Sequence, residues 1–215
     1  MNEGFRGFFH EIPPIRVREP LAETLGAVPA GGELAYSFTD LVKLAGHACP
    51  TMAGAWLACQ AALGALHGDE TPVRGNIAVT VYGGPDEGTY GVMAAAFTLL
   101  TGAAPATGFK GIGPRFKRKD LLTFTPQSPA PGWQCFEFRR LDTGRAVLVK
   151  FSPRAVPFAP EKSRRMGELM EKVAWEAVRP EESAEFQELW MEKVRVMLVE
   201  KNRIEDWLSV EERSA

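Results

Sequence analysis

The sequence is poor in the residue types that build disulfide frameworks and metal clusters. Its 215 residues include three cysteines and three histidines, and none of the cysteines forms a Cys-x-x-Cys pair. Three widely spaced cysteines cannot all pair within one chain, which excludes a disulfide framework, and the spacing excludes a zinc knuckle. We therefore expect a reducing, cytoplasmic compartment.

Long apolar runs and an excess of positive charge are also missing. No stretch reaches the roughly 20 apolar residues of a membrane span, and charge and proline interrupt the first residues before a signal-peptide core forms. The net charge is −2, although residues 117–119 read Lys-Arg-Lys. We expect neither a membrane nor a nucleic-acid partner. No nucleophile elbow surrounds a serine, and no P-loop is present.

The composition and the periodic patterns are those of a globular α+β protein, with 45% hydrophobic and 24% charged residues. Residues 50–66 are apolar or small on every side, which predicts an enclosed central helix, and residues 88–102 predict a second apolar helix. Residues 76–84 read as a buried strand, and residues 133–141 and 145–153 as a hairpin. We predict an antiparallel or mixed sheet packed against these two helices.

Beyond residue 159 the apolar residues recur at helical spacing in two stretches, which predicts a C-terminal pair of amphipathic helices. The expected organisation is a core with an N-terminal extension over residues 1–158 and a helical tail over residues 159–215. In the second stretch, Phe186, Trp190 and Met197 share one stripe. This stripe packs either on the chain's own core or against a second copy, and we expect a homodimer.

The stretch with the clearest chemistry is Gly-His-Ala-Cys-Pro at residues 46–50. A cysteine before the proline that opens a helix lies at the N-cap, where the helix dipole favours a thiolate over a thiol. His47 could bind the same metal ion as Cys49 or hold its proton. The alternative is that Cys49 packs under the turn while His47 satisfies a backbone carbonyl.

A metal site at this turn needs ligands from elsewhere in the chain. Cys59 and His67 lie about 15 and 27 Å further along the same helix, which excludes both. The remaining candidates are His10, Asp86, Glu87 and Cys135, of which His10 is the best.

A second candidate site is the loop Gly-Phe-Lys-Gly-Ile-Gly-Pro-Arg at residues 108–115. Gly108 and Gly111 would let the backbone approach a ligand, while Lys110 and Arg115 could hold a phosphate or carboxylate. The alternative is a structured loop with a solvated basic edge. We expect this loop to form the wall opposite the His-x-Cys turn.

Residues 36–125 resemble the FmdE-like family, named for a protein encoded with formylmethanofuran dehydrogenase. The family's hallmark is the Gly-His-x-Cys-Pro turn opening a helix, followed by a helix ending in Thr-Gly and a glycine- and lysine-rich segment running into a strand. The resemblance implies an α+β core with His47 and Cys49 at the metal or active site. The family's other cysteines are missing here, including those of a C-terminal zinc finger.

We therefore expect an FmdE-like protein that binds a divalent metal, zinc, through His47, Cys49 and His10. As an enzyme it would act on a small anionic molecule, with Cys49 as ligand or nucleophile, His47 as ligand or proton carrier, and Lys110 or Arg115 as the anion anchor. The alternatives are an accessory or assembly protein of a molybdenum- or tungsten-type redox enzyme, and a metal-free protein with a reactive thiol.

Overall fold

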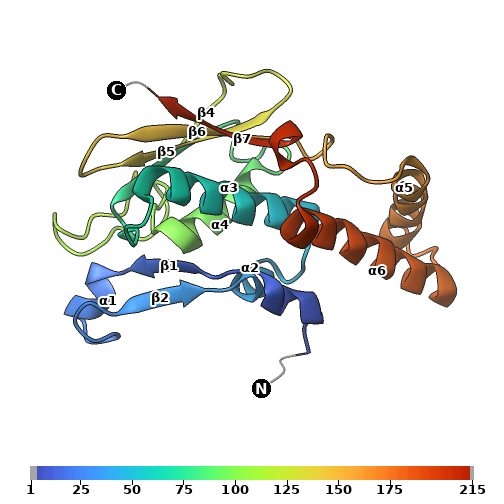
Figure 1. The fold of residues 1–215 in the computed structure, drawn as a ribbon, viewed down its shortest axis with the longest axis horizontal. Helices are drawn as coiled ribbons and strands as arrows, with labels where there is room; N and C mark the ends of the chain where they lie inside the picture. Colours follow the sequence, from blue (N-terminus) through green and yellow to red (C-terminus); the bar gives the residue numbers. More distant parts are fainter. Residues whose placement is uncertain (1–3, 214–215) are drawn as a thin grey trace.

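The computed structural model describes residues 4–213 and has the predicted α+β architecture. A mixed five-stranded sheet lies on one side of α3 and α4, and a two-stranded ribbon with α1 and α2 lies on the other side (Figure 1). The pair α5 and α6 extends from one end of this core (Figure 1). The elements are β1 (Ile15–Arg18), α1 (Pro20–Thr24), β2 (Glu33–Tyr36), α2 (Phe38–Ala45), α3 (Pro50–His67), β3 (Ile77–Tyr82), α4 (Tyr90–Thr101), β4 (Leu122–Thr125), β5 (Gln134–Arg140), β6 (Ala146–Phe151), α5 (Pro160–Ala174), α6 (Pro180–Arg195) and β7 (Leu208–Arg213).

The sheet has the strand order β4-β3-β5-β6-β7. Strand β3 pairs in parallel with β4, because α4 and a long loop carry the chain back between them, and the other pairings are antiparallel. The predicted hairpin is confirmed as β5 and β6, and Phe136 and Phe138 both point into the core with no exposed surface. Buried and half-buried residues alternate along β3, as expected for a strand in a sheet with one covered face.

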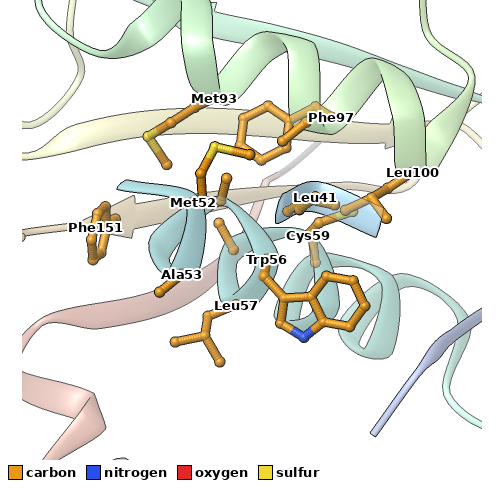
Figure 2. Close-up of a cluster of buried hydrophobic side chains, with 14 of the residues drawn as sticks. Leu41, Met52, Ala53, Trp56, Leu57, Cys59, Met93, Phe97, Leu100 and Phe151 are labelled. Carbon is orange, nitrogen blue, oxygen red and sulfur yellow. The ribbon is translucent and has the colours of Figure 1, made fainter. Parts of the chain in front are cut away.

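The enclosed central helix is confirmed as α3, which has buried residues on all its sides. Figure 2 shows Met52 pointing toward Met93 and Phe97 of α4, whereas Trp56 points away from α4. The ring of Trp56 meets that of Phe38 in α2 edge-on, with 6.0 Å between the centroids. At Gly54 the ring of Phe151 occupies the space of a side chain, since a Cβ added there would lie 2.3 Å from the ring. Gly54 therefore lets the sheet come close to α3, while large side chains fill the space on the other sides of the helix.

The tail predicted from residue 159 has its two helices as far as Glu200, followed by a short 3-10 turn at Ile204–Asp206. Helix α6 continues into a π-helical turn at Val196–Glu200, and residues 208–213 form β7 instead of a helix. Strand β7 pairs with β6 and so covers backbone groups that would otherwise be an open sheet edge. Trp207 is fully buried just before β7. The last two residues of the predicted tail lie outside the described residues.

Candidate functional site

The Gly-His-Ala-Cys-Pro turn connects α2 to α3, and its local geometry follows from its sequence. Gly46 ends α2 in the left-handed region with φ of 74°. Cys49 is the N-cap of α3, and Pro50 is its first helical residue, as predicted. The Cys49 sulfur accepts a hydrogen bond from the backbone N–H of Met52 at 3.4 Å. The thiol therefore takes the place that a serine or aspartate side chain takes in other helix caps.

His47 is exposed and is held by the turn itself. Its Nδ1 lies 2.9 Å from the carbonyl oxygen of Ala45. A carbonyl can only accept, so Nδ1 carries the proton, and in the neutral imidazole Nε2 keeps its lone pair. This is the arrangement in which a histidine can act as a base or ligand through its outer nitrogen.

The expected metal ligands are not brought together. Within residues 4–213, no group of three His, Cys, Asp or Glu side chains is placed to hold a metal ion. Cys49 is 6% exposed and faces its own helix end, whereas His10 is exposed on the 3-10 turn Gly7–Glu11. Cys135 is fully buried on β5, and Asp86 is exposed in the loop before α4. The donor set therefore does not fit a three-ligand metal site, because its members come from separate parts of the fold.

The turn instead forms one wall of a groove that we call the His47 groove. It has a volume of about 430 Å³ and is lined by Arg6, His47, Ala48, Met170, Phe186, Gln187, Trp190 and Met191. Helix α6 is fastened to the turn, because the indole N–H of Trp190 donates to the carbonyl of Ala48 at 2.8 Å. The side chains of α5 and α6 thus complete a concave apolar surface beside the imidazole.

The predicted amphipathic stripe of α6 is divided between two roles. Val194 and Met197 are fully buried and belong to the chain's own core. Phe186 and Trp190, nearer the start of α6, are half-buried and line the groove. Trp190 also packs against the core, so packing on the chain's own core accounts for the stripe from Trp190 onward and leaves Phe186. The homodimer stays a prediction.

The glycine-rich loop lies elsewhere. Of its four predicted binding residues, Arg115 lines a separate cavity of about 220 Å³, whereas Lys110 is exposed outside that lining. Gly111 is needed by the loop itself, since its φ is 87° and a Cβ there would lie 1.9 Å from the Phe116 carbonyl oxygen. Gly108 packs against the preceding residues Ala104 and Pro105.

The loop and the His47 groove are therefore not the two walls of one cleft. The groove is at the start of α3, whereas the cavity of Arg115 includes Val73 and Asn76, which come after that helix has ended. Eighteen residues of helix separate the two ends by about 27 Å (Figure 1). The sequence suggests one site because both motifs belong to one family resemblance, but the length of α3 holds them apart.

The groove residues of α5 and α6 were not identified as site residues from the sequence. Trp190 lies 142 residues from Ala48 along the chain. An aromatic residue on an amphipathic stripe is what any packed helix contains, so no local signal marks it.

No family model matches the chain, and no curated protein matches it either. Within residues 4–213, none of the helices is both long enough and apolar enough to cross a membrane.

Proposed function

We propose that the chain is a divergent FmdE-like protein that binds an apolar small molecule with one acidic group in the His47 groove. The observation that carries the proposal is the imidazole of His47 at the wall of a mostly apolar groove. Small-molecule sites are concave and mostly apolar, with a few polar groups that fix orientation, and their volumes run from about 300 to 1,000 Å³.

The acidic group follows from the charges of the wall. The polar side chains that line the groove are those of Arg6, His47 and Gln187, and none of them is acidic. Arg6 is paired with Glu188 at 2.8 Å, but Glu188 does not itself line the groove. Arg6 supplies a positive charge for a carboxylate or sulfonate, and His47 presents Nε2 to the ligand, because Nδ1–H is already directed at Ala45.

The geometry favours binding over chemistry at Cys49. The thiol is buried and accepts a helix N–H, and Cys49 does not line the groove. His47 is therefore the group that meets a ligand, as a hydrogen-bonding partner or proton carrier. An accessory role beside a redox enzyme is compatible with such a site, and the ligand would then be the molecule that the protein delivers or senses.

The test uses 1-anilinonaphthalene-8-sulfonate, an aromatic probe with one acidic group, and follows its fluorescence on titration with the full chain. We expect one site, and competition by decanoate but not by decanol. Phe186→Ala should weaken binding at least about tenfold, since burying an aromatic side chain contributes about 1.5–3 kcal/mol. His47→Ala should lose the discrimination between decanoate and decanol.

The matched control is Trp175→Ala, which removes an aromatic residue that is 82% exposed at the end of α5. Binding weakened equally by Trp175→Ala would contradict the proposal, because the probe would then be reporting general surface adsorption. Elemental analysis of the same proteins tests the alternative function, metal binding. Stoichiometric zinc in the wild type, lost in both His47→Ala and Cys49→Ala, would replace the proposal with the metal-binding function.

A further inference from the structure

Four chain segments that are far apart in the sequence converge beside the glycine-rich loop. Glu19 follows β1, Arg74 precedes β3, Gly102 ends α4 and Arg118 lies three residues after the glycine-rich loop. Backbone hydrogen bonds hold the segments together, including Arg74 N–H to the Arg18 carbonyl at 2.8 Å and Gly75 N–H to the Thr101 carbonyl at 2.7 Å. The convergence is therefore a fixed part of the fold.

A buried arginine–glutamate–arginine triad occupies this point. Glu19 is 5% exposed, and its two carboxylate oxygens accept separately, Oε2 from Arg74 at 2.7 Å and Oε1 from Arg118. Oε1 also accepts the N–H of Leu21 at 3.1 Å. Arg74 also donates from Nε and Nη2 to the carbonyls of Leu99 and Thr98 in the last turn of α4. The carboxylate is thus fully committed to groups of the protein.

Arg118 is the incomplete member of the triad. It is 3% exposed, and its Nη1 is buried without a hydrogen-bond partner among the described residues. Burial lowers the pKa of Arg118, and the Glu19 carboxylate opposes that shift without cancelling it. Burying a charged donor without a hydrogen-bond partner costs more free energy than burying a neutral one. Native proteins therefore rarely contain such a group without a partner.

The backbone around Arg118 is shaped to admit its guanidinium. A Cβ at Gly75 would lie 1.7 Å from Nη1, and one at Gly102 would lie 2.4 Å from it. Both glycines also have positive φ, 86° and 74°. Any side chain at either position would collide with the guanidinium of Arg118. Glycine at both positions therefore leaves the space that this charged group occupies.

Arg118 and Gly75 also line the cavity of about 220 Å³, together with Pro20, Val73, Arg74, Asn76, Arg115 and Phe116. Arg74, Arg115 and Arg118 carry three positive charges, and Glu19 carries one negative charge. The net charge in and around the cavity is therefore +2. This excess equals the charge of a phosphate dianion, and guanidinium groups match phosphate oxygens in geometry.

We propose that this cavity is a binding site for a phosphate group, either inorganic phosphate or the phosphate of a small phosphorylated molecule. Arg118 and Arg115 bind the oxygens, Arg74 contributes charge while its donors stay on Glu19 and α4, and Asn76 offers an amide at the wall. The site differs from the Lys110 loop edge expected from the sequence, and it is separate from the His47 groove.

Isothermal titration of the full chain tests the proposal with inorganic phosphate, glycerol 3-phosphate and acetate at one ionic strength set with chloride. We expect a single phosphate site, with acetate at least about tenfold weaker, because one negative charge compensates only half of the excess. Tighter binding of glycerol 3-phosphate than of inorganic phosphate would identify the ligand as a phosphorylated molecule, and the reverse order would identify the free ion.

The variant of choice is Arg115→Gln, because Arg115 is exposed and its loss does not disturb the triad. It should weaken phosphate binding about tenfold, the effect of one charge-assisted hydrogen bond. Lys117→Gln removes the same charge from an exposed residue of the same loop outside the cavity lining, and it should change the affinity less than about twofold.

Arg118→Met should abolish binding, and His47→Ala should leave it unchanged, which separates this proposal from that of the groove. Equal effects of Arg115→Gln and Lys117→Gln would overturn the site, because they would show a general response to charge. Absence of phosphate binding by the folded wild type, or acetate bound as tightly as phosphate, would overturn it as well.

Discussion

Glu19→Gln is expected to lower the free energy of unfolding by about 3–5 kcal/mol, the range measured when one partner of a buried ion pair is removed. The carboxylate is 5% exposed and accepts from both Arg74 and Arg118. Glutamine has almost the same shape, so packing is preserved while two guanidinium groups lose their common counter-charge. Urea unfolding at pH 7, analysed by linear extrapolation, measures the change.

Arg118→Met changes the second member of the same triad. Arg118→Met should cost less than Glu19→Gln, because Glu19 remains paired with Arg74 and an unpartnered buried donor is removed. In the Arg118→Met background, Glu19→Gln strands only one guanidinium. The two substitutions should therefore be non-additive by more than about 1 kcal/mol. A loss below about 1 kcal/mol for Glu19→Gln, with an unchanged denaturant slope, would refute the buried triad.

Three further outcomes are expected. Burial, with Arg140 nearby, lowers the pKa of His67, so the folded state holds a neutral imidazole that the unfolded chain protonates near pH 6.5. Its contribution to stability is present above that pH and is lost as the pH falls, and His67→Gln should flatten the dependence of the urea midpoint between about pH 7 and 5. Gly54→Ala should cost about 1–3 kcal/mol by overpacking against Phe151 but be tolerated in a Phe151→Leu background, as thermal unfolding of the four proteins would show. Burial raises the pKa of the Cys59 thiol, so iodoacetamide should leave Cys59 unmodified in the native protein and alkylate it in urea, and peptide mass spectrometry that finds native labelling would contradict this.

Much of the fold was predictable because its signals are local. The enclosed helix α3, the apolar helix α4 and the hairpin of β5 and β6 each follow from periodicity and from punctuation by proline and glycine within a short window. The N-cap position of Cys49 is predictable for the same reason, because Pro50 fixes where the helix begins. Strand β7 escaped prediction, since a short half-polar segment becomes a strand only when the free edge of β6 is available to pair with it.

The candidate sites likewise have a part that is predictable from local sequence and a part that depends on tertiary structure. The sequence alone identified the candidate residues: the imidazole of His47, the capping thiol of Cys49 and the arginine of the glycine-rich loop. Only the tertiary structure decided which of them meet. It places Trp190 against Ala48 across 142 residues, and Glu19 against Arg118 across 99 residues. Within residues 4–213 it does not bring His10, His47 and Cys49 together as a three-ligand metal site. The physical reason is that hydrogen bonds within helices and turns depend on neighbouring residues, whereas contacts between segments depend on how whole helices and sheets pack, which no short stretch of sequence records.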